Sequence, residues 1–145
     1  ALRETREYFE DWFQSASDFE EGARDAIARG KVKLAAFLLH QATERFYHCL
    51  FLVRTLWSPK SHNLNRLRDM AEELEPALKS VWPRKTRFER RCYSLLRDAY
   101  VKARYSSAYR VTDEELDWIA ARVADLQEAV RVACHARIDD LAQAA

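Results

Sequence analysis

Glycine and proline are scarce in this chain, whose 145 residues include two glycines and three prolines. β-Sandwiches, β-barrels and glycine-rich phosphate loops all need many turn residues, so this scarcity argues against them. The chain also lacks a run of about eighteen uncharged apolar residues, and we therefore expect no membrane-spanning helix.

Cysteine is rare as well, with three residues at wide spacing. This spacing does not suit a disulfide framework or a zinc site, so we expect Cys49, Cys92 and Cys134 to be buried, reduced thiols. The N-terminal segment has acidic and aromatic residues where a signal peptide needs a basic and then an apolar stretch. These absences together predict a cytoplasmic protein.

Helical periodicity runs almost unbroken along the sequence. Apolar residues recur at intervals of three and four, which is typical of amphipathic helices. Thr86 with Glu89 and Thr112 with Glu115 have the spacing of capping boxes that start two of these helices. The predicted helices span about 3–29, 31–56, 63–75, 86–109 and 112–140. The short connections predict an all-α fold, a single domain over residues 1–145 built as an antiparallel up-and-down bundle of four long helices and one short helix.

Charge is unevenly distributed although the net charge is only +1. Residues 84–110 carry a net charge of +7, whereas residues 1–30 carry −4 and residues 111–145 carry −5. One interpretation is that neighbouring helices complement each other electrostatically. The other is that the basic segment forms a surface for phosphate or RNA.

Three polar residues of the second predicted helix share one stripe. His40, Glu44 and His48 follow one another at four-residue intervals. Eight residues of helix span roughly 12 Å, which is too long for all three to bind one ion, so we predict no metal site. Gln41 and Glu44 suit a buried hydrogen-bonded pair between helices. His62 precedes a helix, where a histidine more often braces a loop than acts as a base.

The end of the basic helix has the chemistry that a nucleotide needs. Arg104 offers a planar fork for phosphate, and Tyr105 and Tyr109 offer rings for base stacking. The alternative is a solvated helix face on which Arg104 pairs with Asp113 or Glu114. The sequence alone does not separate these two interpretations.

Three segments together resemble the HEPN domain family. Residues 34–53, LAAFLLHQATERFYHCLFLV, resemble its signature helix, in which a Glu follows a Gln by three residues. Residues 61–67, SHNLNRL, are similar to its Ser/Thr-His-Asp/Asn-Leu segment, and residues 100–105, YVKARY, to its Ala-Arg-Tyr segment. The three occur in the family's order, so the resemblance covers nearly the whole chain.

The resemblance implies a helical bundle that forms a homodimer and binds a nucleotide or RNA beside a polymerase-β-type nucleotidyltransferase. The transferase signature is absent, so this chain would be the partner or a fragment of one. The resemblance implies a binding groove and no cofactor. Its expected ligand-binding residues are Gln41, Glu44, His62, Arg104, Tyr105 and Tyr109.

Ribonucleases of this family carry an Arg followed, after four to six residues, by a His. No histidine of this chain has that spacing, and Tyr109 stands where Arg104 would require one. A tyrosine is a poor base at neutral pH, so we expect no catalytic residue and no useful RNA cleavage. Two alternatives remain, namely a metal-independent endoribonuclease toxin of a toxin–antitoxin pair with a divergent site and a purely structural helical dimer.

Overall fold

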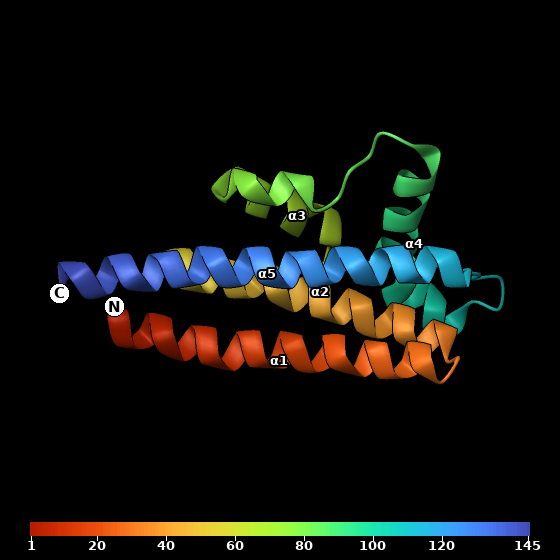
Figure 1. The fold of residues 1–145 in the computed structure, drawn as a ribbon, viewed down its shortest axis with the longest axis horizontal. Coiled ribbons are helices and arrows are strands. Elements are labelled where there is room, and N and C mark those ends of the chain that lie inside the picture. The colour runs from red at the N-terminus through yellow and green to blue at the C-terminus, as the bar shows by residue number, and fades with distance from the viewer.

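The computed structural model describes residues 1–145 and is helical throughout (Figure 1). The helices are α1 (Leu2–Ala28), α2 (Val32–Thr55), α3 (Leu64–Leu74), the 3₁₀ helix η1 (Pro76–Ser80), α4 (Arg87–Tyr105) and α5 (Asp113–Ala144). The prediction of an all-α bundle is confirmed. None of the helices combines the length and the apolar character that a membrane span requires.

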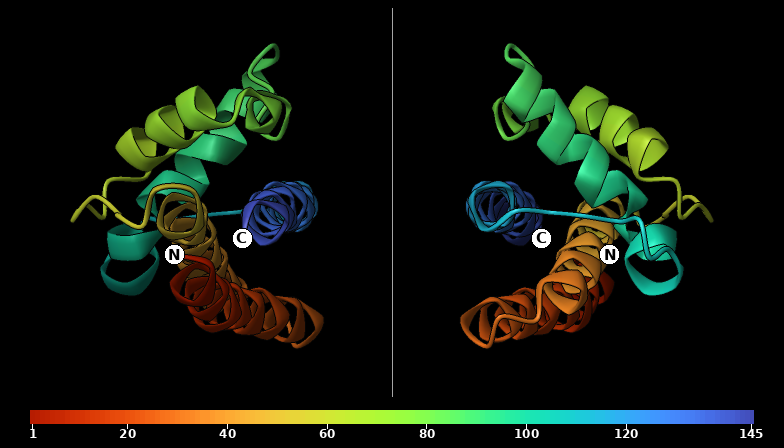
Figure 2. Two further views of the ribbon diagram at one scale, coloured as in Figure 1. Left: turned by 90° about the vertical axis from the view of Figure 1, so that its left-hand side faces the viewer. Right: turned by 90° about the vertical axis from the view of Figure 1, so that its right-hand side faces the viewer.

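Three long helices lie along the length of the molecule, and the others cover one side of them. α1 and α2 run in opposite directions, and α5 runs in the same direction as α2 (Figure 1). α4 lies steeply across this length, and α3 packs beside it (Figures 1 and 2). Gly30, with φ of +70°, makes the tight turn between α1 and α2, a conformation that glycine adopts without a side-chain clash.

α2 is the central helix and packs against α1, α3, α4 and α5. Most of its side chains are buried, because neighbours surround it on nearly every face. Its polar residues are therefore buried too: Glu44, His40 and His48 have little contact with water. Buried polar groups need partners, so the environment of these three residues identifies the candidate site.

The predicted starts of the last two long helices are confirmed. The Thr112 hydroxyl accepts a hydrogen bond from the Glu115 amide at 3.1 Å, and the Glu115 carboxylate accepts one from the Thr112 amide at 2.8 Å. Thr86 and Glu89 form the same reciprocal pair at the start of α4. Each capping box satisfies two backbone donors that would otherwise lack partners.

α4 ends four residues earlier than its sequence pattern predicts. It stops at Tyr105 because Ser106 adopts an extended backbone conformation. The chain then folds back, and the buried Tyr109 donates a hydrogen bond from its hydroxyl to the Leu95 carbonyl at 2.7 Å. Tyr109, which was predicted to end the helix, is instead a buried residue of the loop that follows it.

The three cysteines are free and buried, as predicted. Cys49 of α2 lies against Cys134 of α5. A hydrogen bond with Cys134, together with burial, raises the pKa of the Cys49 thiol well above its usual range. Cys49 is therefore a protonated packing residue at the contact between the two helices.

Candidate functional site

Three histidines surround the buried carboxylate of Glu44. His62 makes a short hydrogen bond from Nδ1 to Glu44 Oε1. On the helix itself, His40 Nδ1 lies 3.9 Å from Oε2 and His48 Nε2 lies 3.9 Å from Oε1. No group of three or more His, Cys, Asp or Glu side chains has an arrangement that could hold a metal ion.

Two of these histidines favour the neutral form. Burial lowers the pKa of the His40 imidazole, against the opposing effect of the Glu44 carboxylate. Burial likewise lowers the pKa of His48, whose Nδ1 is hydrogen-bonded to the Ser58 hydroxyl. Both side chains therefore brace the carboxylate as neutral groups.

His62 is the member of the cluster that reaches solvent, with its side chain 82% exposed. It lies in the connection between α2 and α3, and the next residue caps α3: Asn63 Oδ1 accepts a hydrogen bond from the Arg66 amide at 3.1 Å. This cap fixes the loop, and Glu44 fixes Nδ1. The other ring nitrogen, Nε2, has no protein partner.

A groove of about 330 Å³ opens between His62, the start of α3 and one face of α4. His40 closes its base from α2. Its lining residues are His40, His62, Asn63, Leu64, Asn65, Arg97, Asp98, Tyr100, Val101 and Lys102. The groove thus combines an anchored imidazole, two cationic side chains and an exposed aromatic ring.

Arg104 lies one helical turn beyond Tyr100, among aromatic rings. Its guanidinium carbon is 4.9 Å from the Phe37 ring centroid, 4.5 Å from Tyr100 and 4.8 Å from Tyr105. Its Nε donates to the Tyr100 carbonyl at 2.7 Å. The alternative pairing with Asp113 or Glu114 is not formed, and Arg104 takes part in no ion pair with an acidic side chain. Its positive charge therefore remains available to an anionic ligand.

The Tyr100 ring connects the two halves of the site. Its centroid lies 5.5 Å from that of the His40 imidazole, and the Arg104 guanidinium stacks on the same ring. A ligand in the groove could therefore contact His62 and Arg104 together across Tyr100.

The structure brings most of the sequence-predicted site residues together. Glu44 and His62 are hydrogen-bonded, and Arg104 and Tyr105 are stacked nearby. Gln41 makes no hydrogen bond with Glu44. Its amide nitrogen donates to His40 Nδ1 at 3.3 Å, so Gln41 contacts the cluster through His40. Tyr109 lies apart from the groove, buried under the end of α4.

Sequence reasoning missed the five lining residues that α4 supplies, among them three with cationic or aromatic side chains. Arg97, Tyr100 and Lys102 were part of a basic helix, but their place opposite His62 depends on how α4 crosses α2. The available signal was Tyr100 itself, a large aromatic residue beside charged residues in the YVKARY segment.

Comparison with protein families finds a match to the model of the HEPN domain over residues 9–133. The match includes every residue of the groove and of the aromatic cluster around Arg104. Comparison with curated proteins finds no match.

Proposed function

The chain belongs to the HEPN domain family, and on that premise we propose that it binds a ribonucleotide, free or within single-stranded RNA, in the groove between α3 and α4. The observation that carries this proposal is His62, an exposed imidazole anchored by the buried Glu44 and facing a groove with cationic and aromatic walls.

The charges of the groove favour a phosphate ligand. Asp98 is its only carboxylate, and it accepts from Arg97 Nε at 3.1 Å and from Lys102 Nζ at 3.4 Å. One carboxylate shared by two cations leaves an excess of positive charge, and exposed pairs of this kind hold their partners weakly. Phosphate contacts from Arg and Lys supply most of the affinity of sequence-independent nucleic-acid binding.

The remaining groups suit a base and a ribose. Tyr100 is partly exposed between His40 and Arg104, and stacking of a base on an aromatic ring contributes about 1–3 kcal/mol. Nε2 of His62 can hydrogen-bond a ribose hydroxyl or a phosphate oxygen. Tyr105 and Arg104 extend the same stacking surface beyond the groove.

We predict that Arg104→Ala weakens binding of a fluorescently labelled ten-nucleotide RNA about tenfold. The variant removes one phosphate partner, so the slope of log K against log salt should also fall by about 0.7. Fluorescence anisotropy over a salt series measures both quantities. The melting temperature should fall by only a few degrees, because the Arg104 side chain is exposed and each of its three cation–π contacts contributes at most about 0.5–1 kcal/mol.

The matched control is Arg6→Ala, which removes an exposed arginine from α1. It should bind RNA as the wild type does. Equal losses in the two variants would show non-specific attraction to positive charge, and no loss in Arg104→Ala would place the ligand elsewhere.

The runner-up function, metal-independent RNA cleavage, has one observation in its favour. The pairing of His62 with Glu44 orients an imidazole in the way that a general base requires. In our proposal His62 and Glu44 bind the RNA and do not cleave it. Labelled RNA incubated with the protein and EDTA should therefore remain intact on a gel. Cleavage that is lost in His62→Gln would establish the endoribonuclease instead.

The proposal includes a homodimer that works beside a nucleotidyltransferase. The transferase partnership is supported by the QATE, SHNL and ARY segments, and a transferase gene adjacent to or fused with this one would strengthen it. The dimer is supported by exposed apolar side chains, among them Leu56 and Trp57, the latter beside a hollow that also contains Met70. Sedimentation at tens of micromolar should give twice the 17.0 kDa of one chain, and a single-chain mass would contradict it.

A further inference from the structure

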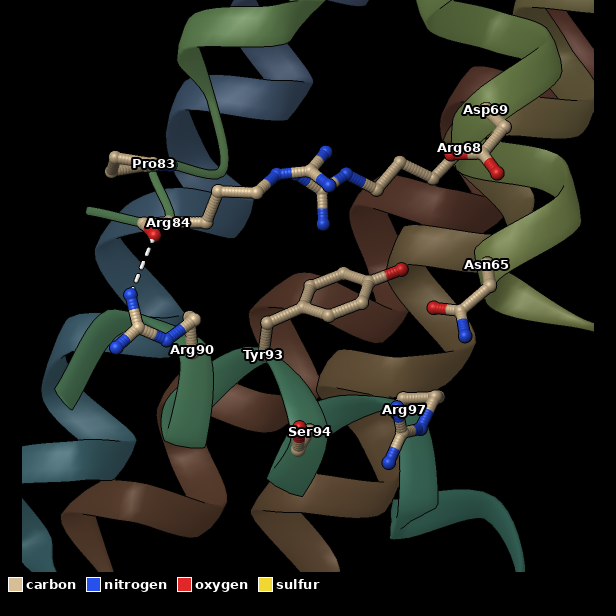
Figure 3. A pocket seen from close by; sticks show the side chains of 9 residues that line it. All are labelled: Asn65, Arg68, Asp69, Pro83, Arg84, Arg90, Tyr93, Ser94 and Arg97. Carbon is tan, nitrogen blue, oxygen red and sulfur yellow. Dashed lines mark hydrogen bonds between the residues drawn. The ribbon is translucent and has the colours of Figure 1, made fainter. Parts of the chain in front are cut away.

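A second hollow, of about 360 Å³, lies between α3, α4 and the loop that contains Arg84. Four of its nine lining residues are arginines, Arg68, Arg84, Arg90 and Arg97, and only one is acidic. Figure 3 shows these side chains around the ring of Tyr93. Arg97 and Asn65 also line the groove beside His62, so the two hollows are neighbours.

Arg68 is held rigidly on one side of this hollow. It is buried, its Nε donates to Glu72 Oε2 at 2.8 Å and its Nη2 donates to the Trp82 carbonyl at 3.0 Å. Its guanidinium carbon lies 4.4 Å from the centroid of the Tyr93 ring. Its Nη1 has no protein acceptor. A guanidinium fixed in this way loses little conformational freedom when it binds an anion.

Arg84 reaches into the hollow from the opposite side (Figure 3). Its Nη2 lies 3.9 Å from Glu72 Oε1, so the carboxylate that pairs with Arg68 also faces Arg84. Arg90 holds the loop in place by donating to the Arg84 and Lys85 carbonyls, each at 3.0 Å. Four guanidinium groups line the hollow, against the carboxylate of Asp69 and that of Glu72 beside it, so the charge around the hollow is positive.

Tyr93 supplies an independent sign of a ligand-binding site. Its side chain is buried, with the residue only 8% exposed, and its hydroxyl proton has no protein acceptor, because the neighbouring Arg68 guanidinium offers only donors. In Figure 3 this hydroxyl points across the hollow between Arg68 and Asn65. Burial raises the pKa of Tyr93, so the hydroxyl keeps its proton and can donate. Buried hydroxyls in native proteins nearly always have a partner, so one whose proton is unpaired in an arginine-lined hollow indicates an anionic acceptor.

We propose that this hollow binds a phosphate group, with Arg68 and Arg84 holding its oxygens and the Tyr93 hydroxyl donating to it. The phosphate belongs to the RNA in the neighbouring groove, as a terminal monoester or an internal diester. This origin rests on the proposed function, whereas the phosphate site itself does not. A terminal monoester carries about −1.5 to −2 charges and suits the excess of guanidinium groups better.

The first experiment uses inorganic phosphate as the probe, at constant ionic strength maintained with chloride. Phosphate should raise the melting temperature of the wild type in a saturable manner, because a ligand of the folded state stabilises it. Arg84→Gln should weaken phosphate binding about tenfold. The control is Arg87→Gln, which removes the exposed arginine at the first position of α4. Arg87 does not line the hollow, so this variant should bind phosphate normally.

Tyr93→Phe is the second variant, because it removes only the hydroxyl. It should fold at least as stably as the wild type without phosphate, and it should bind phosphate several times more weakly. No saturable stabilisation of the wild type, or equal effects in Arg84→Gln and Arg87→Gln, would overturn the phosphate site.

The second experiment compares RNA with a 5′-phosphate, RNA with a 5′-hydroxyl and RNA with a 3′-phosphate. Tighter binding of one phosphorylated form, lost in Arg84→Gln, supports a terminal phosphate; equal binding of all forms that Arg84→Gln weakens supports an internal phosphodiester. Phosphate binding without RNA binding would retain the site and remove the proposed function. If RNA binds equally well to Arg84→Gln and phosphate does not stabilise the wild type, the proposed function would be retained and the phosphate site would be removed.

Discussion

Replacing Trp82 by alanine is expected to lower the free energy of unfolding by about 3–5 kcal/mol, as large-to-small substitutions of buried aromatic residues do. Trp82 is 1% exposed and its indole packs against Tyr93. Its Nε1 donates to the Tyr47 hydroxyl at 3.0 Å, and its carbonyl accepts from Arg68. The substitution therefore leaves a cavity and also removes the donor to a buried hydroxyl.

Urea denaturation followed by far-UV circular dichroism measures this loss. Single domains are typically stable by about 5–15 kcal/mol, so the variant should unfold at a much lower urea concentration. Tyr105→Ala is the control, because that aromatic side chain is 75% exposed and its removal should change stability by no more than about 0.5 kcal/mol. A loss below about 1 kcal/mol in Trp82→Ala would contradict the position of Trp82 in the core.

Acidification from pH 7.5 to pH 5.5 is expected to destabilise the protein through His40 and His48. Burial lowers the pKa of both imidazoles in the folded state, against an unfolded value near 6.5. The unfolded chain therefore binds more protons below that value, and stability is complete above it and is lost as the pH falls. Over this interval each histidine can remove at most about 1.4 kcal/mol, so the total loss should not exceed about 2.7 kcal/mol.

Glu44, His62 and Arg104 also influence the His40 proton, and Glu44, His62 and Arg45 that of His48. Urea denaturation at a series of pH values therefore needs variants as well as the wild type. His40→Gln should flatten the pH dependence of the free energy of unfolding. His135→Gln, which removes an exposed histidine packed on Phe9, should leave it unchanged. A wild-type stability that rises on acidification would show that the cluster holds charged imidazoles in the folded state.

The helices could be predicted from the sequence because apolar periodicity and the two capping boxes are local signals. The end of α4 could not, because no glycine or proline marks it, and the apolar Tyr109, which was expected to end the helix, packs on Leu95 from a loop. Periodicity indicates which side chains are buried, and a loop that folds back buries a side chain as well as a helix does.

The candidate site was predictable in part for the same reason. Glu44 and His62 stood out in the sequence segments, and the structure joins them. Their neighbours Arg97 and Tyr100 come from a helix that crosses α2, and no local pattern encodes that crossing. The hollow proposed to bind phosphate combines Arg68 of α3, Arg84 of a loop and Tyr93 of α4. Counting charges along the chain identified the basic segment, but it could not show that these three residues meet in one pocket.

The most direct test of ribonucleotide binding in the groove is to follow the imidazole resonances of the four histidines by NMR while single-stranded RNA is added. His62 lines the groove with its Nε2 free, and His40 forms the base of the groove, whereas His135 packs on Phe9 in α1. We predict that the His62 signals shift most, that those of His40 follow and that those of His135 do not move. RNA binding that leaves the His62 signals unchanged, or that shifts His135 alone, would contradict the account.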